Sequence, residues 1–189
     1  MASLCVFCGS SSGSDPRHGD VARSLGDSLA ADGHALVYGG GHVGLMGAVA
    51  DAALAAGGDV IGVMTEQLVA AEVAHHGLTR LEVVASMHER KARMAELSDG
   101  VIVLPGGFGT LDEAFEIITW NQLGLVAVPV VFLDPAGYFE ALFEFIDRSV
   151  AAGFVSDRHA RSVQRVGSVA DAVRLATAAP AAFSPKWSS

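Results

Sequence analysis

The sequence predicts an α/β fold, a doubly wound and mostly parallel sheet flanked by helices in a single domain. Two patterns predict it: short apolar runs alternate with helical patterns along the chain, and the connections between them are short. The composition agrees, because 51% of the 189 residues are hydrophobic and 17% are charged, as expected for strands buried on both faces. The domain is expected to cover residues 1–179. Residues 180–189 mix Pro, Ala and Ser and are expected to form a disordered tail.

Six apolar runs bounded by Gly, Pro or polar residues predict the strands, at residues 3–8, 35–38, 60–64, 81–84, 100–104 and 130–133. The first run contains both cysteines of the chain, Cys5 and Cys8. Residues three apart in a strand point to opposite faces, which favours two buried thiols over a redox or zinc pair. Two cysteines provide no disulfide framework, and this favours a reducing compartment, the cytoplasm.

Helical patterns fill the intervals between these runs. Val21, Leu25 and Leu29 recur every four residues and form one apolar stripe, whereas residues 45–56 are apolar on nearly every side and predict a helix buried on two faces. Further helices are expected at 87–97, 111–123, 138–150 and 170–176. In a sheet of this kind ligands bind at the carboxyl ends of the strands, so the functional residues should follow the strand ends.

The charge of the chain excludes some classes of partner. Twelve Lys and Arg against 21 Asp and Glu give a net charge of −9, the opposite of what nucleic-acid binding through phosphates requires. The longest apolar runs, such as 125–133, are half of the ~18 residues that a membrane span needs. We therefore expect neither a nucleic-acid nor a membrane partner, and an anionic ligand would be held by backbone N–H groups and a few arginines.

Three glycine-rich turns follow predicted strands, at residues 9–14, 39–47 and 105–110. Glycine lets the backbone approach a ligand, and a helix that begins directly afterwards adds partial positive charge, so each turn is a candidate phosphate site. The alternative is that the glycines only make tight strand-to-helix turns. The chain has no P-loop motif. The spacing Gly39-x-Gly41-x-x-Gly44 fits a dinucleotide fingerprint, but such a match carries little weight among 22 glycines.

The run from Pro105 to Glu113 resembles the P-G-G-x-G-T-x-x-E signature of the LOG family of cytokinin riboside 5′-monophosphate phosphoribohydrolases. Blocks at 5–11, 38–41, 44–47, 87–94 and 118–124 are similar to other family blocks in the same order, so the resemblance covers residues 3–166. It implies a Rossmann-like fold, a homodimer and a small-molecule nucleotide substrate. The implied reaction is hydrolysis of the N-glycosidic bond of an N6-substituted AMP to the free base and ribose 5-phosphate.

By motif position, the resemblance implies that Arg90 and Glu113 are catalytic. It implies substrate contacts at Gly9, Ser10, Gly40, Gly41, Glu72, Lys91, Gly106, Gly107, Phe108, Gly109, Thr110, Leu111, Asp112 and Thr119. We expect no cofactor, and no His or Cys spacing in the sequence indicates a metal site.

The residue types suit this chemistry independently of the resemblance. Breaking the bond between a ribose and a purine develops positive charge on the sugar and negative charge on the base. The Glu113 carboxylate could stabilise the cation and position or deprotonate water. The rigid guanidinium fork of Arg90 could hold the 5′-phosphate or orient Glu113. Gly107, Gly109 and Thr110 are expected to hold phosphate oxygens.

Purely structural roles remain open for the same residues. Thr110-x-x-Glu113 is also a capping box, in which Thr110 would be the N-cap of a helix and Glu113 would accept from its N–H. Arg90 and Lys91 could be solvated charges in the first turn of a helix, where they would oppose the helix dipole unless an anion lies nearby.

Two other functions also remain open. One is a non-catalytic nucleotide or cofactor carrier, which the glycine turns alone would serve. The other is a pyridoxal-phosphate lysine decarboxylase, which needs a Schiff-base lysine. The chain contains two lysines, Lys91 in the matched motif and Lys186 near the end.

Overall fold

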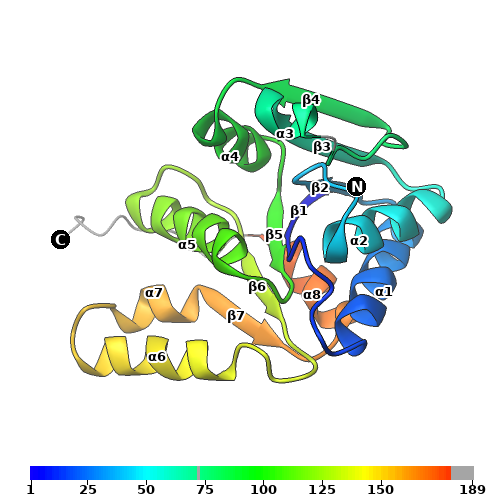
Figure 1. Ribbon diagram of the computed structural model, residues 1–189. Coiled ribbons are helices and arrows are strands. Elements are labelled where there is room, and N and C mark those ends of the chain that lie inside the picture. The colour runs from blue at the N-terminus through cyan, green and yellow to red at the C-terminus, as the bar shows by residue number, and fades with distance from the viewer. Residues whose placement is uncertain (72, 180–189) are drawn as a thin grey trace.

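The protein forms one seven-stranded sheet in the computed structural model, which describes residues 1–71 and 73–179 (Figure 1). Each pair of neighbouring strands is parallel, and the order is β4-β3-β2-β1-β5-β6-β7. The strands are β1 Ser3–Phe7, β2 Ala35–Tyr38, β3 Val60–Thr65, β4 Arg80–Val84, β5 Gly100–Val103, β6 Val130–Leu133 and β7 Val163–Val166. The predicted α/β class with a parallel sheet is confirmed. The predicted tail at 180–189 lies outside the described residues.

The strand order reverses between β1 and β5. The chain first builds outward from β1 to β4 and then returns to place β5, β6 and β7 on the other side of β1. In a doubly wound sheet, the crevice at such a switch point opens at the carboxyl ends of the two central strands. The loops that follow β1 and β5 therefore face the same crevice.

Helices cover both faces of the sheet (Figure 1). They are α1 Arg17–Ala31, α2 Gly44–Ala55, α3 Glu66–Ala70, α4 Met87–Glu96, α5 Phe108–Leu123, α6 Glu140–Ala151, α7 Asp157–Arg161 and α8 Val169–Ala176. Side chains of α1, α2 and α8 share one hydrophobic core, and side chains of α4, α5 and α6 share a second core on the opposite face. The predicted helices are confirmed, with ends that differ by a few residues.

The two cysteines lie on opposite sides of the sheet, as their spacing predicts. Cys5 belongs to the core under α4 and α5, and Cys8 belongs to the core under α1 and α2. Both are free and buried, and burial raises the pKa of each thiol well above its ordinary value. They are therefore buried thiols held in the uncharged form.

Three elements were not predicted from the sequence: β7, α3 and α7. The strand β7 is an edge strand of four residues in which Gln164 and Arg165 are exposed, so no apolar run marks it. The helices α3 and α7 have five residues each, too few to show a helical period, and both begin at a side-chain cap, Thr65 and Ser156.

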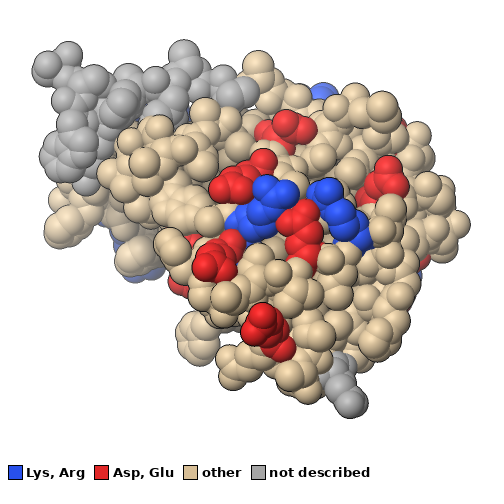
Figure 2. Space-filling model, turned by 90° about the horizontal axis from the view of Figure 1, so that it is seen from above, with Lys and Arg blue, Asp and Glu red and all other residues tan. Residues whose placement is uncertain are grey.

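The β4 edge of the sheet carries charged side chains beside the exposed apolar side chains of Leu81 and Val83. Figure 2 views the molecule from this side and shows basic and acidic side chains interleaved near the centre of the face. Glu82 of β4 pairs with Arg80 at 3.2 Å and with Arg93 of α4 at 2.7 Å. Such charges on an edge strand oppose pairing with a further strand. Among the helices described, none has the length and apolar character needed to cross a lipid bilayer.

Candidate functional site

A cavity of about 300 Å³ opens at the carboxyl ends of β1, β2 and β5. The β1–α1 loop contributes Gly9 and Ser10, the start of α5 contributes residues 107–110 with Asp112 and Glu113, and α4 contributes Arg90. The three predicted glycine-rich turns thus meet at one place, as the sheet topology requires. The cavity lies at the switch point between β1 and β5.

Arg90 is the buried cation of this cavity, with 6% of its surface exposed. The Ser86 hydroxyl caps α4 by accepting from the Glu89 N–H, which places Arg90 in the first turn of the helix. Its Nε donates to the Val63 carbonyl at 2.8 Å, its Nη2 donates to the Gly39 carbonyl at 3.2 Å, and its Nη1 donates to Glu113 Oε1 at 3.1 Å. These three bonds fix the guanidinium plane.

Gly39 makes room for this arginine. A Cβ atom at position 39 would overlap the Nη2 atom of Arg90. The glycine that follows β2 therefore lets the guanidinium lie against the backbone, whereas the sequence predicts a phosphate site at this turn.

Glu113 is the buried partner of Arg90, with its side chain 13% exposed. Burial raises the pKa of the Glu113 carboxyl above its ordinary value, and the nearby Arg90 guanidinium opposes the rise. Placing both charges in the interior carries a desolvation cost that their attraction often fails to offset, so such a pair is weak as a device for stability. A carboxyl with a raised pKa beside a cavity is instead typical of acid–base chemistry.

The capping-box interpretation of Thr110 and Glu113 is wrong. Helix α5 begins at Phe108, its N-cap is Gly107, and no side chain of the described residues caps it. Thr110 is therefore inside the first turn, and the Glu113 carboxylate is directed to Arg90. The helix starts earlier than predicted because Gly107 takes an extended conformation and leaves the next residue free to begin the turn.

The N-terminus of α5 presents free donors to the cavity. The N–H groups of Gly107, Phe108, Gly109 and Thr110 have no hydrogen-bond partner within residues 1–71 and 73–179. All four residues line the cavity. Unpaired N–H groups and the positive end of the dipole of a 16-residue helix together make a site for an anion.

The structure brings together most of the predicted site residues. Those lining the cavity are Gly9, Ser10, Arg90, Gly107, Phe108, Gly109, Thr110, Asp112 and Glu113. Residues that the sequence analysis did not assign to the site also line it, namely Val6, Cys8, Gly39, Met46 and Met87. Their positions at the end of β1, directly after β1 and β2, and in the first turns of α2 and α4 are the signal that could have found them.

Other predicted residues lie outside this cavity. Gly40 accepts a hydrogen bond from the His75 N–H, and Gly41 forms a bridge with Ala74, so both pack against the 73–75 segment. Leu111 and Thr119 line an open groove on the outer side of α5. Gly106 lies behind the cavity, next to Thr110. Glu72 lies outside the described residues.

Lys91 is held between two carboxylates of α5. Its Nζ lies 3.1 Å from Asp112 Oδ2 and 3.1 Å from Glu116 Oε2. Burial lowers the pKa of Lys91, but the hydrogen bonds and charges of the two carboxylates outweigh it, and the net pKa is raised. A Schiff-base lysine needs the neutral amine, so this environment disfavours the decarboxylase interpretation. The other lysine, Lys186, lies outside the described residues.

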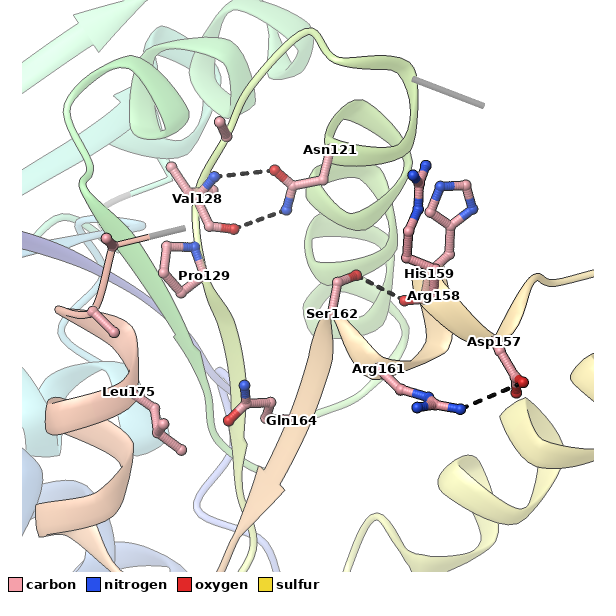
Figure 3. A pocket seen from close by; sticks show the side chains of 13 residues that line it. Asn121, Val128, Pro129, Asp157, Arg158, His159, Arg161, Ser162, Gln164 and Leu175 are labelled. Carbon is pink, nitrogen blue, oxygen red and sulfur yellow. Dashed lines mark hydrogen bonds and ion pairs between the residues drawn. The ribbon is translucent and has the colours of Figure 1, made fainter. Parts of the chain in front are cut away.

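A second cavity, of about 520 Å³, lies at the amino ends of β6 and β7 (Figure 3). The Asn121 side-chain amide donates to the Val128 carbonyl at 2.9 Å and accepts from the Val128 N–H at 3.1 Å. Arg161 pairs with Asp157 at 3.5 Å on the rim. Within the described part of the chain, no group of three or more His, Cys, Asp or Glu is placed to hold a metal ion in this cavity or elsewhere.

Comparison with known protein families and with known proteins identifies relatives of this chain. Residues 46–176 match a family model described as possible lysine decarboxylase. The chain is 49% identical over 156 residues to a probable cytokinin riboside 5′-monophosphate phosphoribohydrolase of Oryza sativa subsp. japonica, covering 82% of this chain and 69% of the relative. It is 48% identical over 155 residues to the cytokinin riboside 5′-monophosphate phosphoribohydrolase of Rhodococcoides fascians, covering 82% and 78%. An Arabidopsis thaliana enzyme of the same name is 44% identical over 171 residues, covering 90% and 79%.

Solved structures share the fold. A structural-genomics target superposes with a TM-score of 0.70 at 23% identity, covering 92% of this chain and 97% of that chain. The molybdenum cofactor carrier protein of Chlamydomonas reinhardtii superposes with a TM-score of 0.69 at 23% identity, covering 92% and 94%. At this level of sequence identity, the similarity shows a shared arrangement of sheet and helices and nothing more.

Proposed function

This chain belongs to the LOG family of cytokinin riboside 5′-monophosphate phosphoribohydrolases, and on that premise we propose that it hydrolyses the N-glycosidic bond of an N6-substituted adenosine 5′-monophosphate. The products are the free base, a cytokinin, and ribose 5-phosphate. The observation that carries the proposal is the buried pair of Arg90 and Glu113, 3.1 Å apart, beside the free N–H groups of α5.

The two parts of the cavity suit the two ends of the sugar. The N–H groups of Gly107 and Gly109, with the hydroxyl of Thr110, hold the 5′-phosphate at the helix N-terminus. Gly9 and Ser10 close the same side of the cavity from the β1–α1 loop. A phosphate seated there leaves the ribose in front of Glu113.

Glu113 acts at the reacting carbon. The bond between ribose C1′ and purine N9 breaks, and its electron pair leaves with the base. The carboxylate stabilises the positive charge on the sugar and accepts a proton from the water that attacks C1′, while the base takes a proton from solvent. A raised pKa suits a group that must accept this proton.

Arg90 orients the carboxylate. Its guanidinium is already fixed by the carbonyls of Val63 and Gly39, so Glu113 meets a rigid partner and not a mobile side chain. Arg90 also lines the cavity, so its guanidinium can donate hydrogen bonds to an anionic substrate.

The outer face of α5 supports a homodimer. Phe108 is 95% exposed, and it lines an open groove with Leu111, Phe115 and Trp120. A contiguous apolar surface of this kind is typical of an interface between copies. Light scattering should give twice the mass of one chain, and Phe115→Asp should shift the mass to that of one chain. A wild-type protein with the mass of one chain would contradict the dimer.

Release of free base from isopentenyladenosine 5′-monophosphate tests the proposed function. We expect equimolar isopentenyladenine and ribose 5-phosphate, measured by chromatography and by a reducing-sugar assay. Binding of the nucleotide without release of the base would support a carrier instead.

The two buried free thiols fit a reducing compartment, and we propose that the protein is cytoplasmic.

A further inference from the structure

The loop between β6 and α6 reaches the back of the phosphate site. Tyr138, in this loop, donates its hydroxyl hydrogen bond to the Gly106 carbonyl at 2.7 Å. Its ring meets Phe139 edge to face at 5.0 Å and His18, at the start of α1, at 5.7 Å. Tyr138 thus links the start of α1 with the loops that follow β5 and β6 at the carboxyl edge of the sheet.

The base of this loop is anchored in the interior. Asp134 follows β6, and its side chain is 1% exposed. Its backbone N–H donates to the Val166 carbonyl at 2.8 Å, and its Oδ2 accepts from the Phe139 N–H at 3.1 Å. Asp134 therefore holds the backbone of the residue next to Tyr138, while half of the Tyr138 surface is exposed to solvent.

The hydrogen bond constrains a functional peptide. The carbonyl of Gly106 and the N–H of Gly107 belong to one planar trans peptide, so they point in opposite directions. A bond that holds the carbonyl toward Tyr138 directs the N–H of Gly107 away from Tyr138. Gly107 lines the cavity, its N–H has no partner among the described residues, and a Cβ at this position would meet nothing within 4 Å. Neither glycine has a side chain that would prevent rotation of this peptide.

We propose that Tyr138 is a positioning residue that locks the Gly106–Gly107 peptide so that the N–H of Gly107 faces the 5′-phosphate. The proposal rests on the proposed function and adds a residue to it. Tyr138 touches neither the ribose nor the base in this arrangement, so its contribution is confined to recognition of the phosphate.

Tyr138→Phe is the direct test, because it removes the hydroxyl and keeps the ring contacts with His18 and Phe139. The chain offers a matched control in its other tyrosine. Tyr38 is fully buried in the core, and its hydroxyl has no hydrogen-bond partner among the described residues. Tyr38→Phe removes the same atom without removing a bond.

The expected result is a split between kinetic parameters. Tyr138→Phe should raise KM for isopentenyladenosine 5′-monophosphate by about three- to tenfold and leave kcat within about twofold, since one neutral hydrogen bond is lost. Inhibition by ribose 5-phosphate should weaken by the same factor, and inhibition by the free base should not change. Tyr38→Phe should behave as the wild type in each assay.

Two results would overturn the proposal. One is an unchanged KM and unchanged inhibition by ribose 5-phosphate in Tyr138→Phe. The other is equal weakening of both inhibitors, which would indicate a general distortion of the site. If the wild type releases no base, the proposed function fails, and calorimetric binding of ribose 5-phosphate to the wild type and to Tyr138→Phe then decides alone. Equal affinity, or no binding to the wild type, would reject the role of Tyr138.

Discussion

The two ends of the sheet carry cavities of different character. The cavity at the amino ends of β6 and β7 is larger, about 520 Å³ against about 300 Å³. Its buried polar side chains include His159 and Asn121, and the Asn121 amide is satisfied by the backbone of Val128. The cavity at the carboxyl ends holds the buried ion pair of Arg90 and Glu113, next to N–H groups that have no partner in the described part of the chain. The volume of a cavity therefore does not identify the candidate functional site. A buried charge that stability does not need, beside donors left open, marks it.

Removing the carboxylate should give the largest effect. We expect Glu113→Gln to lower kcat by about 10²- to 10⁴-fold while the protein stays folded, because the amide cannot accept the proton of the attacking water. Steady-state release of isopentenyladenine measures the loss, and circular dichroism checks the fold. Glu82→Gln is the matched control, since Glu82 also pairs with an arginine of α4 but lies on the β4 edge. Near-normal turnover in Glu113→Gln would show that the carboxylate in the carboxyl-end cavity is not needed for the reaction.

Replacing the guanidinium should come next. Arg90→Lys keeps the charge but cannot bond Val63, Gly39 and Glu113 together, so the carboxylate loses its fixed orientation. We expect kcat/KM to fall by about 10²-fold, the size of effect that a misplacement of about 1 Å produces. Arg93→Lys, on the same helix but at the surface ion pairs, should retain activity. Equal activity of the two variants would mean that burial of the arginine is incidental.

The pH profile should show the raised pKa of Glu113. Activity needs the carboxylate, so kcat/KM should fall as the pH drops through the pKa of this group. Burial raises that pKa, and the acid limb of the profile should therefore lie above 4.5, the ordinary value for Glu. A limb at or below that value would show that the charged form is not disfavoured in the cavity.

A substitution in the cavity at the amino ends of β6 and β7 should lower stability and leave activity unchanged. Asn121→Ala leaves the Val128 N–H and carbonyl without their partners, and we expect the free energy of unfolding to fall by about 1–3 kcal/mol. In the proposed mechanism this edge does not contact the substrate, so kcat/KM of the folded variant should remain within about twofold of wild type. Urea unfolding and the base-release assay measure the two quantities. A large loss of activity in protein that is still folded would contradict this prediction, because it would show that Asn121 affects the reaction at the opposite edge of the sheet.

The sheet could be predicted because buried parallel strands leave continuous apolar runs, and the residues that follow such strands meet at one edge. Arg90 and Glu113 were singled out by the motifs that resemble the LOG family, and the structure brings the two side chains together at this edge, 3.1 Å apart. That they are the catalytic pair stays a prediction. The capping box failed because Gly-Phe-Gly gives no local signal for a helix start, and α5 begins at Phe108.

Tyr138 was assigned to a helix that in fact begins at Glu140, so its place in a strand-end loop was missed. Its contact with Gly106 joins residues 32 positions apart, which no local pattern reveals. The same limit applies to Gly39, whose need to be glycine comes from Arg90, 51 positions later in the chain.

The absence of a Cβ atom at Gly39 therefore helps to define the candidate active site, because it leaves room for the Arg90 guanidinium. A single methyl group introduced at position 39 would claim the space of a guanidinium nitrogen, so the most conservative exchange available would displace Arg90 from outside its own helix. In a library of all single substitutions selected for release of the base, position 39 should tolerate as few replacements as position 113, although residue 39 offers the substrate no side chain at all.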